Sequence, residues 1–175
     1  MKVQIRQGVF ETNSSSTHAI SVSRFNNNKV PKTVEFRHDY KFGWEFDEYN
    51  DTCSKAAYFW ITILSLYNDI NDKEKLEKIK QYITNTLESV GVEEIVFQPY
   101  EYETYEFDNC TYANIDGWID HCCGLYDWVI DMLEDRDKFL GWLFNPNSMV
   151  VTGNDNSDEE VYYSDYAEYK YYKGN

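Results

Sequence analysis

Short alternations of apolar and polar residues occur at several places along the chain. Residues 3–6, 19–23 and 33–37 alternate with a period of two, which is typical of half-buried strands. Residues 92–98 form another strand candidate, and residues 149–151 are a short apolar run that predicts a buried strand. The pattern therefore predicts strands near both ends of the chain.

Longer periodic segments predict helices in the middle of the chain. Residues 52–67 are apolar on nearly every face, and Asp51 or Thr52 can cap a helix there, so we expect it at the centre of the core. Residues 72–89 carry apolar positions at helical spacing and end before Gly91, which favours a helix stop. Residues 100–116 are acidic, aromatic and without clear periodicity. Residues 115–143 predict a further helical segment with a break.

Strands at both ends with helices between them indicate an α+β fold. We expect a single domain over residues 1–156, with one mainly antiparallel or mixed sheet packed against several helices. Residues 157–175 form an acidic, Tyr-rich C-terminal segment. Its pattern does not distinguish a strand from a partner-binding segment or a dimer contact.

The charge of the chain is unevenly distributed. The formal net charge is -15, and no Lys or Arg occurs between Lys80 and Arg136, where 13 Asp and Glu lie. Such a segment repels phosphate backbones, which makes free nucleic acid an unlikely partner, and it attracts basic protein surfaces. A charged run is also what an ordinary solvated surface looks like. Five glutamates of this segment are candidate partner-binding residues: Glu93, Glu94, Glu101, Glu103 and Glu106.

Several kinds of chemistry have no support in the sequence. The four cysteines do not form a CxxC pattern, so no zinc site is expected, and no P-loop, dinucleotide fingerprint or nucleophile elbow occurs. The sequence shows no evident cofactor site, and it leaves open whether the protein binds a divalent metal ion. The start of the chain has no signal-peptide pattern and no apolar run is long enough for a bilayer, which predicts a cytoplasmic protein with no membrane partner.

A polar stretch near the N-terminus could hold a phosphate. Residues 11–18 read ETNSSSTH, so hydroxyls and backbone N–H groups are available as donors and His18 as an acid or base. The competing interpretation is a polar connection between two strands. The candidate substrate-binding residues of this stretch are Glu11, Asn13, Ser14, Ser15 and Ser16.

Two further stretches give weaker evidence for a functional site when each is taken alone. Asp120 and His121 place a carboxylate beside an imidazole, which also suits a helix start. Residues 152–156 (TGNDN) are a turn pattern after a buried strand, and they add Asp155 as a candidate catalytic residue and Asn154 and Asn156 as candidate substrate-binding residues. If the fold brings them together, His18, His121 and Asp155 form a minimal acid–base or metal-binding set.

Residues 5–20, IRQGVFETNSSSTHAI, resemble the N-terminus of a group of small proteins from phages and mobile elements of low-GC Gram-positive bacteria. The resemblance continues at residues 119–121 and 151–156, while the middle of the chain is less similar to the group. The group includes type II-A anti-CRISPR inhibitors of the RNA-guided DNA nuclease. This chain has Cys122 and Cys123 where the group continues with Gln-Ser, so a role for these two positions is not carried over.

The resemblance implies an anti-CRISPR protein that acts in the host bacterial cytoplasm on the RNA-guided nuclease with its guide RNA. One inhibitor type of this group leads to shortening of the guide RNA, which implies a ribonuclease with His18 and His121 as base and acid or as metal ligands. Two alternatives stay open. The chain is then either a non-catalytic acidic decoy in a basic nucleic-acid-binding cleft, or another phage enzyme that uses the same loops.

Overall fold

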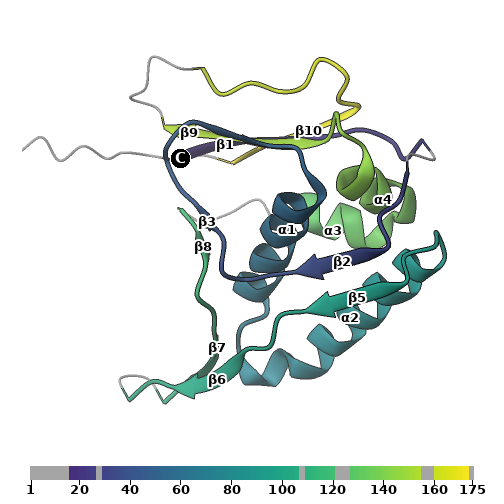
Figure 1. Ribbon diagram of the computed structural model, residues 1–175. Coiled ribbons are helices and arrows are strands. Elements are labelled where there is room, and N and C mark those ends of the chain that lie inside the picture. Colours follow the sequence, from purple (N-terminus) through teal and green to yellow (C-terminus); the bar gives the residue numbers. More distant parts are fainter. Residues whose placement is uncertain (1–15, 27–28, 107–108, 121–126, 155–159, 174–175) are drawn as a thin grey trace, which may run out of the picture.

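The main sheet has four antiparallel strands in the order β10-β1-β9-β4. They are β1 (Ser16–Val22), β4 (Asp47–Tyr49), β9 (Met149–Asn154) and β10 (Tyr169–Lys173). In this computed structural model the described residues are 16–26, 29–106, 109–120, 127–154 and 160–173. All seven residues of β1 are buried, because β1 lies between β10 and β9 and the helices cover the sheet (Figure 1).

The helices of the described residues begin where the sequence offers a cap. Asp51 accepts a hydrogen bond from the Ser54 amide at the start of α1 (Thr52–Leu66), and Asp135 caps α4 (Arg136–Phe144) in the same way. A short 3-10 helix (Ile70–Asp72) leads into α2 (Lys73–Glu88), and α3 (Asp127–Glu134) precedes α4. Within the described residues, no helix is long and apolar enough to cross a membrane.

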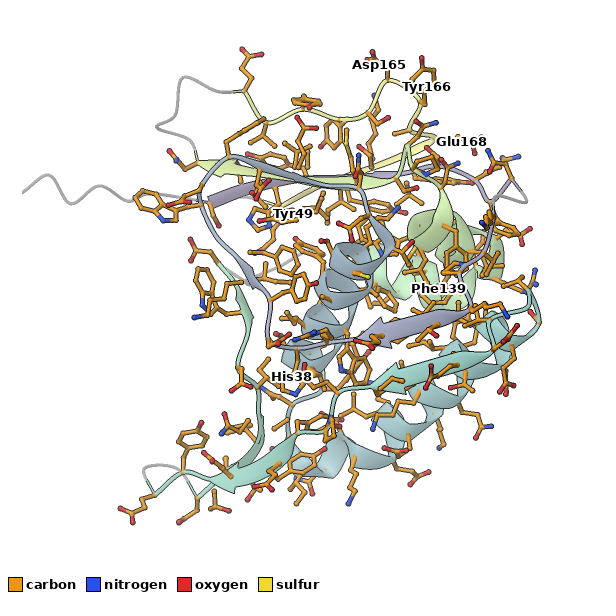
Figure 2. All side chains as sticks on the ribbon, viewed as in Figure 1. His38, Tyr49, Phe139, Asp165, Tyr166 and Glu168 are labelled. Atoms are coloured by element: carbon orange, nitrogen blue, oxygen red, sulfur yellow. The ribbon has the colours of Figure 1, made fainter. Side chains whose placement is uncertain are left out.

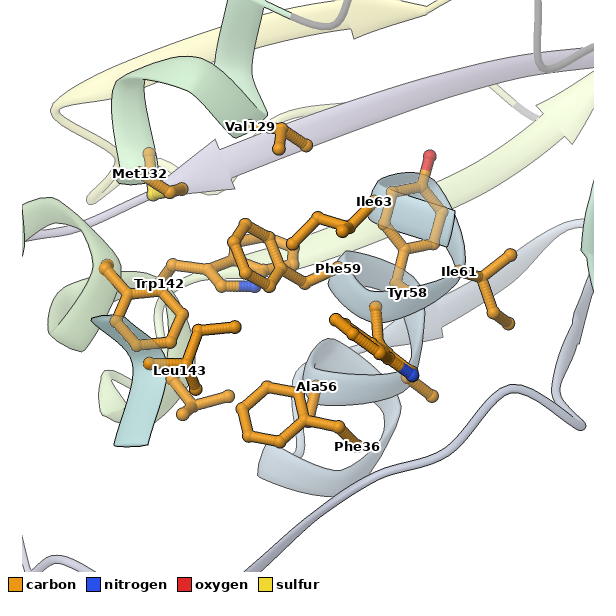
Figure 3. Close-up of a cluster of buried hydrophobic side chains, with 14 of the residues drawn as sticks. Phe36, Ala56, Tyr58, Phe59, Ile61, Ile63, Val129, Met132, Trp142 and Leu143 are labelled. Atoms are coloured by element: carbon orange, nitrogen blue, oxygen red, sulfur yellow. The ribbon is translucent and has the colours of Figure 1, made fainter. Parts of the chain in front are cut away.

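Helix α1 forms the centre of the core. Its residues from Ser54 to Leu64 are all buried, so the helix has partners on every side. Figure 3 shows Phe59 and Ile63 of α1 on the side of Trp142 (α4) and Val129 (α3), while Phe36 of β2 lies beside Ala56. Burial of large apolar side chains around one helix is the main source of stability for a domain of this size.

Three two-stranded units complete the fold. β2 (Thr33–Phe36) pairs in parallel with β5 (Glu94–Phe97), and β3 (Lys41–Phe42) pairs in parallel with β8 (Trp118–Ile119). β6 (Glu101–Thr104) and β7 (Thr111–Asn114) form an antiparallel hairpin. In Figure 1, α1, α3 and α4 lie between the main sheet and the β2–β5 pair, and α2 lies beyond β5.

The α+β class predicted from the sequence is confirmed, with the sheet antiparallel and several helices packed on it. The predicted strands over residues 19–23, 33–37, 92–98 and 149–151 are present with shifted ends, and residues 3–6 lie outside the described residues. The C-terminal segment supplies β10, so part of the region set apart at residues 157–175 belongs to the main sheet.

Three predictions for local structure are wrong. Residues 16–18 belong to β1 and not to a loop, because β9 pairs with all three residues and β10 also pairs with His18. Residues 101–104 and 111–114 pair as the strands of a hairpin, since cross-strand pairing organises a segment that lacks periodicity. The helical segment predicted over residues 115–143 does not start at 115: residues 118–119 form β8, because β3 offers an unpaired edge there.

Candidate functional site

The three polar stretches singled out in the sequence meet at one end of the main sheet. β1 and β9 run antiparallel, so Ser16 lies opposite Asn154. The Ser16 hydroxyl donates to the Asp120 carbonyl at 3.1 Å, and the Lys173 ammonium donates to the same carbonyl from β10. The fold therefore brings together the described ends of all three stretches.

Most of the predicted site residues on these stretches are not among those described. Ser16, His18 and Asn154 are described, whereas the others lie outside the described residues. Those others are Glu11, Asn13, Ser14, Ser15, His121, Asp155 and Asn156. Their contribution to a common site stays a prediction.

His18 lies in the middle of β1 and is fully buried. Its Nε2 donates to the Gly43 carbonyl at 3.1 Å, because a carbonyl can only accept, and Nδ1 therefore accepts from the Tyr58 hydroxyl at 2.9 Å. Burial, and secondarily the positive charge of Lys173, lower the His18 pKa to about 3. The imidazole is neutral with both nitrogens bonded, which favours a structural role over acid–base catalysis.

Three side chains of β1 and β9 fasten one loop. His18, Asn154 and Thr152 donate to three consecutive carbonyls, those of Gly43, Trp44 and Glu45, at 3.1, 3.1 and 2.7 Å. Backbone carbonyls that are shielded from water need protein donors, and here two of the three donors, His18 and Asn154, are residues that the sequence marked as candidate site residues. The polar motifs of β1 and β9 therefore position residues 43–45.

This loop forms one wall of a groove of about 320 Å³, which we call the aromatic groove. It is lined by Lys41, residues 43–47, Tyr49 and Trp118. The Trp118 ring lies over Gly43, where a Cβ would meet it at 3.5 Å. Asn154 donates to the carbonyl of Trp44, so the groove lies beside the end of β9 where the polar stretches meet; Figure 2 labels Tyr49 of β4, another lining residue.

Large aromatic side chains of the groove face the solvent. Trp44 is 48% exposed, Trp118 44% and Phe46 36%, and the Phe46 ring lies 6.4 Å from that of Tyr162. The three other tryptophans, Trp60, Trp128 and Trp142, are buried. Exposed aromatic clusters of this kind are typical of binding surfaces rather than of an inert surface.

The five predicted partner-binding glutamates are exposed, but they do not form one patch. Glu93 pairs with Lys32 at 2.8 Å and Glu94 accepts from Thr33, both at the start of β5. The acidic hairpin, β6–β7 with Glu101, Glu103 and Glu106, lies at the other end of the β5–β6 segment (Figure 1). Glu103 accepts from Asn114 on the neighbouring strand.

The acidic hairpin leads directly to the aromatic groove. β7 ends at Asn114 and β8 begins at Trp118, so residues 115–117 join them along one side of the molecule in Figure 1. Gly117 is required in this connection, because a Cβ there would lie 2.1 Å from the Tyr40 carbonyl. A partner that lies along this side can contact both features.

His38 was not singled out in the sequence, and it too is buried. Its Nε2 donates to the Pro99 carbonyl at 2.9 Å, and Figure 2 labels it in the lower part of the molecule beside β2. It ties the end of β2 to the end of β5. Among the described residues no group of His, Cys, Asp or Glu side chains is arranged to hold a metal ion.

Sequence reasoning missed the aromatic groove. Residues 44–48 read WEFDE, an alternation of aromatic and acidic residues, and this was the available signal. Trp118 lies more than 70 positions along the chain, and only the pairing of β3 with β8 brings it beside this loop. In comparisons with known proteins, no family model, no curated protein and no solved structure matches this chain.

Proposed function

We propose that the protein binds a basic, nucleic-acid-binding surface of a host RNA-guided DNA nuclease and inhibits it by occupying that surface. The observation that carries the proposal is the exposure of Glu101, Glu103 and Glu106 on a hairpin within a segment that has no Lys or Arg. Nucleases of this class hold their heteroduplex in a positively charged channel. The choice of this target rests on the resemblance at residues 5–20.

The electrostatics of the hairpin favour a protein partner. Of its three glutamates, Glu103 accepts a neutral amide hydrogen bond, which leaves its charge uncompensated by that contact. A projecting carboxylate surface accelerates association with a cationic groove by long-range attraction. The neutral, enclosed imidazole of His18 agrees with inhibition by binding, because such inhibition needs no acid–base group there.

The triple substitution E101Q/E103Q/E106Q tests the proposal. We expect the Kd for the nuclease–guide complex to rise by about tenfold at low salt, because each exposed pair contributes about 0.5 kcal/mol. The measurement is binding at two salt concentrations together with DNA cleavage by the nuclease. Binding of the unsubstituted protein should weaken as salt rises, and the variant should show a smaller salt dependence.

The matched control is E74Q/E77Q/E88Q, which changes the net charge by the same amount on the exposed face of α2. We expect this control to keep most of its affinity. An equal loss in both variants would mean that only net charge matters, and unchanged inhibition by the hairpin variant would overturn the proposal.

A second function, cleavage of the guide RNA, is favoured by one observation. Ser16, Asp120 and Asn154 meet at one end of the main sheet, next in sequence to His121 and Asp155. Three polar segments that end at one place can hold a phosphodiester between them. The acidic hairpin then acts as the docking element.

The experiment is to incubate protein, nuclease and guide RNA and to separate the RNA on a denaturing gel. We expect a shortened guide with the unsubstituted protein and an intact guide with H121A or D155N. An intact guide with the unsubstituted protein would remove this second function and leave the first in place.

A further inference from the structure

The aromatic groove combines exposed ring faces with carboxylates. Trp44 and Trp118 expose nearly half of their surface in its lining, and Glu45 and Asp47 are exposed lining residues as well. Among the described residues that line the groove, Lys41 is the single cation. The rings and the carboxylates therefore present the two kinds of surface that attract a flat cation, namely aromatic faces and carboxylate oxygens.

Two carboxylates of the groove lining, Asp47 and Glu45, act on the Tyr49 hydroxyl. Burial, followed by the nearby Asp47 carboxylate, raises the pKa of Tyr49 to about 12. Glu45 acts in the same direction on the same hydroxyl. A positive group that enters the groove encounters both carboxylates, whereas a phosphate is repelled by them.

We propose that the aromatic groove binds an arginine side chain of a partner protein. A guanidinium is planar, stacks on aromatic faces and donates to carboxylates through a fork of N–H groups. The volume of about 320 Å³ is at the lower end for ligand sites, which suits one long side chain rather than a whole segment.

Two other occupants fit less well. A nucleobase also stacks on tryptophan, but its phosphates then lie close to Glu45 and Asp47. A lysine ammonium is a point charge without a flat face, so it uses the rings less effectively. The proposal goes beyond the proposed function, since the groove binds arginine whether or not the acidic hairpin contacts a nuclease.

The groove is preorganised in the free protein. His18, Asn154 and Thr152 hold the carbonyls of residues 43–45, so the loop that carries Trp44 and Glu45 is fastened to the main sheet. A fixed loop loses little conformational freedom on binding, which favours affinity.

Tryptophan fluorescence provides the test. Because Trp60, Trp128 and Trp142 are buried, quenching by acrylamide reports mainly on Trp44 and Trp118. The probe is a glycine-flanked peptide with one arginine, titrated into the full chain at millimolar concentrations. The same peptide with citrulline keeps the shape and removes the charge.

We expect the arginine peptide to protect the exposed tryptophans from acrylamide and the citrulline peptide to bind about tenfold more weakly or not at all. The variant E45Q/D47N should lose the protection, and W44F should reduce the signal. The control E74Q/E77Q, with both substitutions on α2, should behave as the unsubstituted protein. Equal protection by citrulline, retained protection in E45Q/D47N, or stronger protection by a single-stranded oligonucleotide would overturn the proposal.

Discussion

Replacing His18 with alanine is expected to lower the free energy of unfolding by about 3 kcal/mol at pH 7. The imidazole is fully buried, so its removal leaves a cavity beside Tyr58 and takes the donor from the Gly43 carbonyl. The measurement is urea unfolding followed by circular dichroism. T17A is the control on the same strand, with an expected loss below about 1 kcal/mol.

The deficit of H18A should shrink as the pH falls. His18 has a folded pKa of about 3 and an ordinary value of 6.5, so below pH 6.5 the unfolded chain takes up a proton that the folded chain does not. The unsubstituted protein then loses about 1.4 kcal/mol per pH unit from this residue, and the alanine variant does not. Unfolding energies equal within about 0.5 kcal/mol, with activity lost, would instead support a catalytic role for His18.

The second large effect concerns Lys55, whose side chain is buried in α1 at 1% exposure. Its ammonium donates to the carbonyls of Asn145 and Ser148 at 2.8 and 3.0 Å, just after the end of α4. Burial lowers the pKa of Lys55 from 10.5 to about 7, and Asp51 opposes the shift only in part. Lys55 therefore joins α1 to the turn before β9. Burying its ammonium charge lowers the stability of the folded state.

Stability of the unsubstituted protein relative to K55M is expected to rise between pH 7 and pH 10 by about 1.4 kcal/mol per pH unit. In this pH range the unfolded chain keeps the proton on Lys55 and the folded chain releases it. The folded state therefore becomes more stable relative to the unfolded state as the pH rises. Urea unfolding of both proteins at each pH gives the difference, in which other titrating groups cancel.

K78M serves as the control, because Lys78 is exposed on α2, where it pairs with Glu74. Its stability should run parallel to that of the unsubstituted protein across the same pH range. A K55M curve that also runs parallel would mean that the folded chain keeps the proton on Lys55 up to pH 10, which would contradict the lowered pKa of this residue.

The helices with strong local signals were predictable. For α1 the signal was a continuous apolar run after Asp51, and for α2 it was a stripe at helical spacing that ended before Gly91. Both signals depend on neighbours within a few residues, so the sequence contains them in full. The α+β class follows from the same local information.

The hairpin β6–β7 and the pair β3–β8 were not predictable in this way. β3 and β8 are two residues long, and each is a strand only because the other lies beside it. The Lys41–Trp118 pairing joins residues far apart in the chain, and no local propensity encodes it. The same pairing creates the aromatic groove, so this groove could not be found from the sequence.

The candidate site was predicted only in part. The sequence singled out residues 11–18, 119–121 and 152–156 and left open whether the fold brings them together; in the structure Ser16 pairs with Asn154 and its hydroxyl donates to the Asp120 carbonyl. It also assigned His18 to chemistry, whereas its two nitrogens are taken up by Tyr58 and Gly43. A histidine in a polar motif looks the same in the sequence whether it faces a cleft or the core.

The sequence by itself determined the helices, the fold class and the long segment without a cation, because these depend on residue type and short-range order. Only the tertiary structure decided which side chains are buried and which segments meet. In the structure His18 is buried, and side chains of β1 and β9 donate hydrogen bonds to the carbonyls of residues 43–45. The Trp118 ring lies against that loop. The reason is that burial and pairing depend on contacts between distant residues, which fix the hydrogen bonds and the charge state of each group.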